Sequence, residues 1–103
     1  MIKITEIIKH NYALDFFATP EKKMIWKGSN YEKMIQDKLD EIKQISWSSA
    51  WGKSRLTRKN NDEVKFTEIE IRIALKFKTT NKKKQQEIIV EITEFLQTKF
   101  TTK

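Results

Sequence analysis

The stretch from Ile69 to Phe77 places an apolar residue at every second position, and it constrains the fold more than any other part of the chain. Strict alternation over this length puts successive side chains on opposite faces of a β-strand. The apolar set is Ile69, Ile71, Ile73, Leu75 and Phe77, mostly β-branched or aromatic residues that suit a half-buried strand. We therefore predict a long β-hairpin of two strands, at about 45–59 and 63–78.

The turn-forming residues at 60–62 suggest the register of this hairpin. If they form the loop, Trp51 lies opposite Ile71 and Trp47 opposite Leu75. Both tryptophans then fall on the apolar face, which favours this register. A slip of one residue would move them to the other face.

Two features of the hairpin remain open at this point. Near the tip the same register places Leu56 opposite Phe66 on the other face, and either a bulge at 67–68 or a small second apolar patch would explain this. The face opposite the tryptophans is expected to be exposed, either as a plain solvated surface or as a platform for another sheet, a helix or a nucleic acid backbone. Its residues are Ser46, Ser48, Ala50, Gly52 and Ser54.

The N-terminal segment is predicted to be a helix at about 5–17, since Ile4, Ile7, Ile8 and Leu14 form an incomplete helical stripe. A short strand at 1–4 is the alternative there. Proline at position 20 disfavours helical backbone before it and is expected to end the helix. A short strand at 23–27 is predicted to follow.

Two further helices are predicted at about 30–44 and 82–100, and all three helices are expected to pack on one face of a small antiparallel sheet. Ser29 and Glu32 have the spacing of a capping box at the start of the first of these two. The lysines at 82–84 oppose the dipole of the last helix. A later start of that helix or a bound phosphate would remove the conflict.

Length and composition predict a single α+β domain spanning residues 1–103. Hydrophobic content of 38% and charged content of 34% are typical of a folded chain rather than a disordered one. The chain has no cysteine, which fits a reducing compartment, and charged residues interrupt the apolar residues at its start, so no signal peptide is expected. We expect a cytoplasmic location.

No combination of residues predicts catalysis. Gly52-Lys53-Ser54 resembles the end of a phosphate-binding loop, but Trp47 stands where the first glycine belongs and the segment lies inside a predicted strand. Residues 63–65 match only a fragment of a metal-dependent nuclease motif. His10 is the only histidine, and metal-ligand spacing is absent. We therefore predict a protein that is not an enzyme, with no catalytic residue, metal or cofactor.

The net charge of +7 favours a polyanionic or acidic partner. One group of cations lies near the predicted hairpin tip and another at the start of the last helix, roughly 40 Å away along straight strands. Because the tryptophans are expected in the core, phosphate contact is expected rather than base reading. The predicted contact residues are Lys53, Arg55, Arg58, Lys59, Lys82, Lys83 and Lys84.

The leading hypothesis is a small basic binding protein that engages DNA, RNA or a nucleoprotein through the hairpin and the lysine cluster. The alternative is a protein–protein interaction module that inhibits a larger protein or serves as its adaptor, for example a module that comes from a mobile element. That module would act through a sheet face or a sheet edge. A homodimer through the face of small residues is compatible with both hypotheses.

Overall fold

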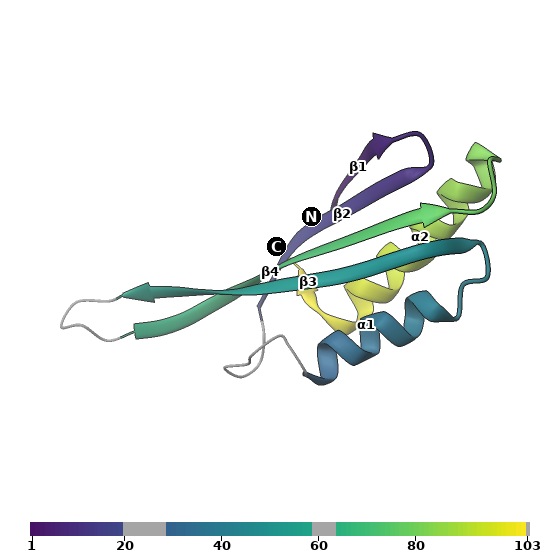
Figure 1. Ribbon diagram of the computed structural model, residues 1–103. Coiled ribbons are helices and arrows are strands. Elements are labelled where there is room, and N and C mark those ends of the chain that lie inside the picture. Colours follow the sequence, from purple (N-terminus) through teal and green to yellow (C-terminus); the bar gives the residue numbers. More distant parts are fainter. Residues whose placement is uncertain (20–28, 59–63, 103) are drawn as a thin grey trace.

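The fold is α+β, with a sheet on one side and helices on the other (Figure 1). It is known from a computed structural model that describes residues 1–19, 29–58 and 64–102. The elements in chain order are β1 (Lys3–Ile8), β2 (Asn11–Thr19), α1 (Asn30–Asp40), β3 (Ile45–Arg58), β4 (Val64–Phe77), α2 (Lys82–Lys99) and β5 (Thr101–Thr102). The predicted hairpin, the fold class and the packing of helices on one face are confirmed.

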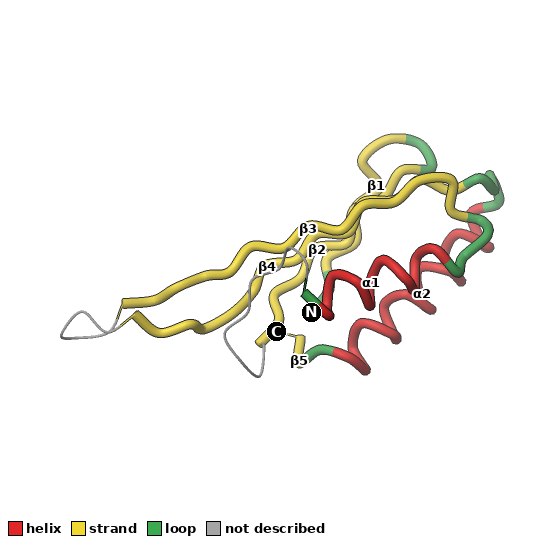
Figure 2. The backbone as a smooth tube through the Cα atoms, turned by 60° about the horizontal axis from the view of Figure 1, so that its bottom comes forward, coloured by secondary structure: helices red, strands yellow, loops and turns green. Residues whose placement is uncertain are grey.

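The sheet is antiparallel, with strand order β1-β2-β4-β3 and with β5 paired to the end of β2. The hairpin strand β3 therefore forms one edge and β1 the other. Figure 2 shows α1 and α2 side by side in a single layer beneath the sheet. The opposite face of the sheet has no helix over it within the described residues.

The predicted helix at 5–17 is wrong, because this segment forms the β1–β2 hairpin. Its second half alternates with a period of two: Tyr12, Leu14, Phe16 and Ala18 are buried. Apolar residues also occur between them, and this hid the alternation from a search for a helical stripe. The turn between the strands requires a positive φ of 68° at His10.

The predicted hairpin register is correct at both ends and wrong by one residue between them. Ile45 pairs with Phe77 as predicted, but an extra residue on β3 at Ser46 then shifts the register. The Ser46 hydroxyl donates to the Lys76 carbonyl at 3.2 Å, which holds this irregularity in place. Trp47 consequently pairs with Lys76 instead of Leu75, and both tryptophans move to the face away from the helices.

A second irregularity, at Thr67 on β4, cancels the first. Beyond it the predicted pairs Leu56–Phe66 and Arg58–Val64 are restored. Of the two alternatives left open for the tip, the structure therefore contains the bulge at 67–68. No pattern in the sequence had indicated the matching shift at Ser46.

The middle of the face of small residues is partly covered by α1 rather than exposed, which corrects the second expectation for the hairpin there. Ala50 packs against the core, and the Ser48 hydroxyl accepts a hydrogen bond from the Gln36 amide of α1 at 3.3 Å. Small side chains on this side of β3 let α1 approach the strand closely. Ser48 and Ala50 therefore lie under a helix and do not form an exposed platform.

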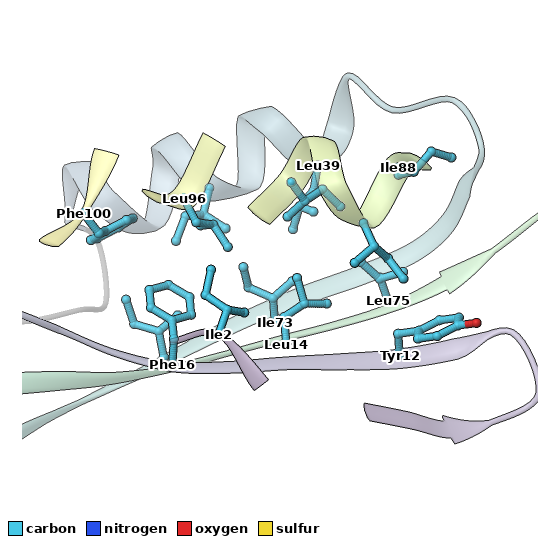
Figure 3. Close-up of a cluster of buried hydrophobic side chains, with 14 of the residues drawn as sticks. Ile2, Tyr12, Leu14, Phe16, Leu39, Ile73, Leu75, Ile88, Leu96 and Phe100 are labelled. Atoms are coloured by element: carbon cyan, nitrogen blue, oxygen red, sulfur yellow. The ribbon is translucent and has the colours of Figure 1, made fainter. Parts of the chain in front are cut away.

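The core lies between the sheet and the two helices (Figure 3). The alternating residues of β4, from Ile69 to Phe77, are all buried, as their spacing predicts. Leu14 and Phe16 of β2 lie beside them, and the helices contribute the other half. The fully buried helical side chains are Ile35, Leu39, Ile89, Ile92 and Leu96.

Both helices begin at a capping residue. The Ser29 hydroxyl accepts from the Glu32 backbone N–H at 3.1 Å, and Asn81 caps α2 through the Lys84 N–H. The first of these helices ends at Asp40, earlier than the predicted 44, because the chain turns there to enter β3. Neither α1 nor α2, the two helices among the described residues, has the apolar stretch that a membrane-spanning helix requires.

Candidate nucleic-acid interface

The face of the sheet turned away from the helices, here called the open face, carries both described tryptophans. Trp47 and Trp51 lie on β3 with 55% and 50% of their surface exposed. Exposure of single apolar residues is common in proteins, but Trp is among the largest side chains to leave in water. The expectation that these two residues belong to the core is wrong.

Each tryptophan lies across the strand pair from a cation. Trp47 pairs with Lys76, and Trp51 pairs with Arg72. Directly paired residues of antiparallel strands share a face and have Cβ atoms about 5 Å apart. The open face therefore repeats one unit, an indole beside a positive charge, along the β3–β4 pair.

Arg72 is held in place by Asp15 of β2. The guanidinium donates two hydrogen bonds to this carboxylate, from Nε at 2.6 Å and from an Nη at 3.2 Å. Asp15 also raises the pKa of Arg72 above its ordinary value, so the guanidinium stays charged. Together with Trp51 and Glu70, the pair lines a shallow hollow of about 320 Å³ on the open face.

The hairpin continues beyond the rest of the sheet as a two-stranded arm. The β2–β4 pairing ends at Ala18 and Ile69, whereas β3 and β4 stay paired as far as Arg58 and Val64 (Figure 1). The arm adds to the length of a molecule that is 54 Å long and only 22 and 21 Å across. It extends the line of β3, which carries the tryptophans.

The structure distributes the first predicted group of cations along this strand. Lys53 is exposed and lies two residues beyond Trp51 on β3. It pairs with Glu70, which is half-buried. Arg55 and Arg58 lie on the arm, opposite Glu68 and Val64. Lys59 lies outside the described residues, as does the short strand predicted at 23–27.

The second predicted group lies at the other end of the molecule and on the helical side. Lys82 is engaged there, because its Nζ forms an ion pair with the Glu6 carboxylate and lies 3.4 Å from the Tyr12 hydroxyl. Lys83 and Lys84 are exposed. The Asn81 cap and the Glu6 charge explain how α2 begins at Lys82 in spite of three lysines in its first turn.

A buried polar cluster anchors the β1–β2 turn to α2, and it is structural. Gln85 is fully buried, and its amide nitrogen lies 2.7 Å from the Thr79 carbonyl and 2.8 Å from His10 Nδ1. Its amide oxygen accepts from the Tyr12 hydroxyl at 3.0 Å. Both polar atoms of the amide therefore have hydrogen-bond partners. His10 links the β1–β2 turn to α2 through its contact with Gln85.

Metal chemistry gains no support from the side chains. Within residues 1–19, 29–58 and 64–102, no group of three His, Cys, Asp or Glu residues is placed to hold a metal ion. An open groove lies between the helices, and its walls mix charges of both signs around Met34 and Phe95.

Sequence reasoning missed Trp47 and Trp51 as surface residues. The usable signal was the run of small residues alternating with them, since Ser48, Ala50 and Gly52 leave room for a helix and the tryptophans do not. That pattern is visible in the sequence, but its meaning depends on where α1 packs.

Comparisons with known proteins do not place the chain in a family. No family model and no solved structure matches it. One similarity is to an isoleucine–tRNA ligase of Streptococcus mutans, 34% identical over 61 residues, which cover 54% of this chain and 6% of the ligase. The chain therefore spans only a small fraction of that relative, and this similarity does not extend the ligase's activity to it.

Proposed function

We propose that the protein is a small, non-enzymatic nucleic-acid-binding protein that acts through the open face and the basic arm. The observation that carries this proposal is the repeated pairing of an exposed tryptophan with a cation on a sheet face that no described helix covers. Flat aromatic surfaces beside positive charges match the two parts of a nucleotide, its base and its phosphate. The proposal includes a cytoplasmic location.

The distribution of charge favours the arm over the start of α2 as the main phosphate contact. Arg55 and Arg58 continue the strand that carries the tryptophans, so a bound polyanion can follow β3 without leaving the protein. Lys82 already neutralises Glu6. Lys83 and Lys84 lie at the far end, where they would serve only a long ligand as a secondary contact.

Fluorescence anisotropy with labelled DNA and RNA over a series of salt concentrations tests the proposal. Replacement of Arg55, Arg58 and Lys59 by Gln is expected to weaken binding and to reduce the salt slope by roughly 0.7 to 0.9 for each phosphate that the variant no longer neutralises. The matched control replaces Lys83 and Lys84 by Gln, which is expected to have a smaller effect. Absence of binding to any nucleic acid at low salt would refute the proposed function.

A second candidate function, the protein–protein module, is favoured by the edge strand β1. Ile4, Ile7 and Ile8 there are 43%, 57% and 66% exposed, and β1 has a partner on one side only in the described residues. An exposed apolar edge can accept a strand from another protein. Sedimentation of the wild type and of Ile7→Asp tests this candidate for self-association: a dimer that dissociates in the variant would support it.

A further inference from the structure

The spacing of the two tryptophans limits what the open face can hold. Trp47 and Trp51 are four residues apart on one strand and point to the same face, which separates them by about 13 Å along β3. A single planar ring cannot contact both indoles at that separation. A ligand that stacks on both tryptophans therefore needs a separate ring for each and must present flat groups in series.

The cations beside the tryptophans favour a negatively charged chain as the part of the ligand that connects these flat groups. Lys76 and Arg72 stand in the neighbouring strand, next to Trp47 and Trp51 respectively. A ligand lying along β3 with its rings on the indoles would bring its connecting chain past the Lys76 ammonium and past the Arg72 guanidinium, whose charge Asp15 partly offsets. A chain of phosphates joining planar rings satisfies both requirements.

We infer that the open face binds single-stranded nucleic acid, with one base stacked on Trp47 and a second on Trp51. A base can stack on an indole only if its own face is free, and in a duplex both faces are covered by neighbouring base pairs. The inference rests on the proposed nucleic-acid binding and adds that the ligand is single-stranded and that stacking contributes to its affinity.

A second copy of this chain is the competing occupant of the face. Two copies placed face to face would bring Lys53, Arg72 and Lys76 of one copy against the same cations of the other, although Asp15 and Glu70 offset part of this charge. A single strand complements the cations and can also continue onto the arm. These two features favour the polyanion.

The test uses the full chain with Trp26 replaced by Phe, which leaves Trp47 and Trp51 as the only sources of tryptophan fluorescence. An oligothymidylate, an oligouridylate and a duplex of the same length are titrated against this protein at matched salt. Stacking is expected to quench the indole emission with the single strands and to leave it unchanged with the duplex. DNA and RNA single strands are distinguished by comparing the two homopolymers.

The matched variants are Trp47→Ala and Trp51→Ala, with Trp47→Phe and Trp51→Phe as ring-retaining partners. Each alanine variant is expected to bind the single strands at least about fivefold more weakly, with most of the affinity restored by phenylalanine. Val90→Ala serves as the control, because Val90 is 52% exposed on the helical side. Its affinity is expected to equal that of the parent chain.

The outcomes separate the inference from the proposed function. Equal affinity for duplex and single strands, with unchanged fluorescence and full affinity in the alanine variants, would overturn the stacking inference and leave the nucleic-acid-binding function intact. No binding of any strand would remove both. Indole emission that shifts with protein concentration alone, without nucleic acid, would assign the face to a second copy.

Discussion

The helix-covered face and the open face of the sheet are built from the same strands, yet they differ in what their side chains contact. The covered face is continuous and apolar, and Leu14, Ile73 and Leu75 have almost no exposed surface. The open face mixes aromatic rings with charges, and Trp47 and Trp51 remain half in water. Among the described residues, the helices close over one face, whereas the other face leaves both of its tryptophans half exposed.

This difference shows that side-chain size alone does not decide which face becomes the core. On the middle of β3, Trp47 and Trp51 are outside, whereas the smaller Ser48 and Ala50 face α1 and the core. The reason is that α1 lies directly against this strand and needs a shallow surface. The shift at Ser46 places the tryptophans outside, and the shift at Thr67 returns the tip to its original pairing.

The sharpest contrast between the faces should come from Leu14→Ala on the covered face and Thr5→Ala on the open face. Leu14 is fully buried, so its truncation is expected to lower the free energy of unfolding by about 2 to 5 kcal/mol. Thr5 is exposed, and its truncation is expected to change that energy by less than about 0.5 kcal/mol. Urea denaturation measures both, and equal losses would contradict the assignment of the faces.

A smaller effect should distinguish the neighbouring residues Ala50 and Ser49. Ala50→Leu places a large side chain under α1 and is expected to cost about 1 to 3 kcal/mol. Ser49→Leu adds the same group to the open face and is expected to be nearly neutral. In the uninterrupted register expected from the sequence, Ser49 would face the core and Ala50 would face away from it. A greater loss for Ser49→Leu in thermal or urea denaturation would therefore restore that register.

The smallest expected effect is electrostatic and concerns the contact between β1 and α2. The hydrogen bond from Lys82 holds the pKa of the Glu6 carboxyl below its ordinary value of 4.5. A carboxyl with a lowered pKa in the folded state stabilises the fold above its unfolded pKa, and this contribution is lost as the pH falls through the folded value. Because the pair is exposed, the change is expected to be slight.

The measurement is the free energy of unfolding between neutral pH and the range below 4.5, for the wild type and for Glu6→Gln. The variant is expected to lose less stability on acidification, since it has no carboxyl to protonate at this position. Identical pH profiles for the two proteins would show that the ion pair does not contribute to stability.

The sequence predicted the hairpin well because the alternation from Ile69 to Phe77 is a local property of the strand. It misled us at the N-terminus, where the Ile4, Ile7 and Ile8 stripe suits a helix but the chain forms β1. In the structure these isoleucines lie on an edge strand beyond the cover of the helices, which is why they are exposed. Pairing with distant strands overrode the local pattern there.

The basic arm and the start of α2 can both be recognised in the sequence as runs of cations. The distance between the two runs could only be estimated there, by assuming a straight hairpin. The structure adds that they lie on different layers and that Lys82 is already paired with Glu6. A contact between residues so far apart in the chain depends on how β1 and α2 are brought together. No local pattern at either residue contains that information.

By itself the sequence determined the long hairpin, the buried face of β4, the capped helices and the excess of positive charge. Each follows from residues close together in the chain, through strand alternation, helix periodicity and composition. Only the tertiary structure decided which face of β3 meets α1, and hence that Trp47 and Trp51 face outward. Register depends on a single inserted residue at Ser46, and the space available beneath the sheet depends on a helix packed from elsewhere in the chain.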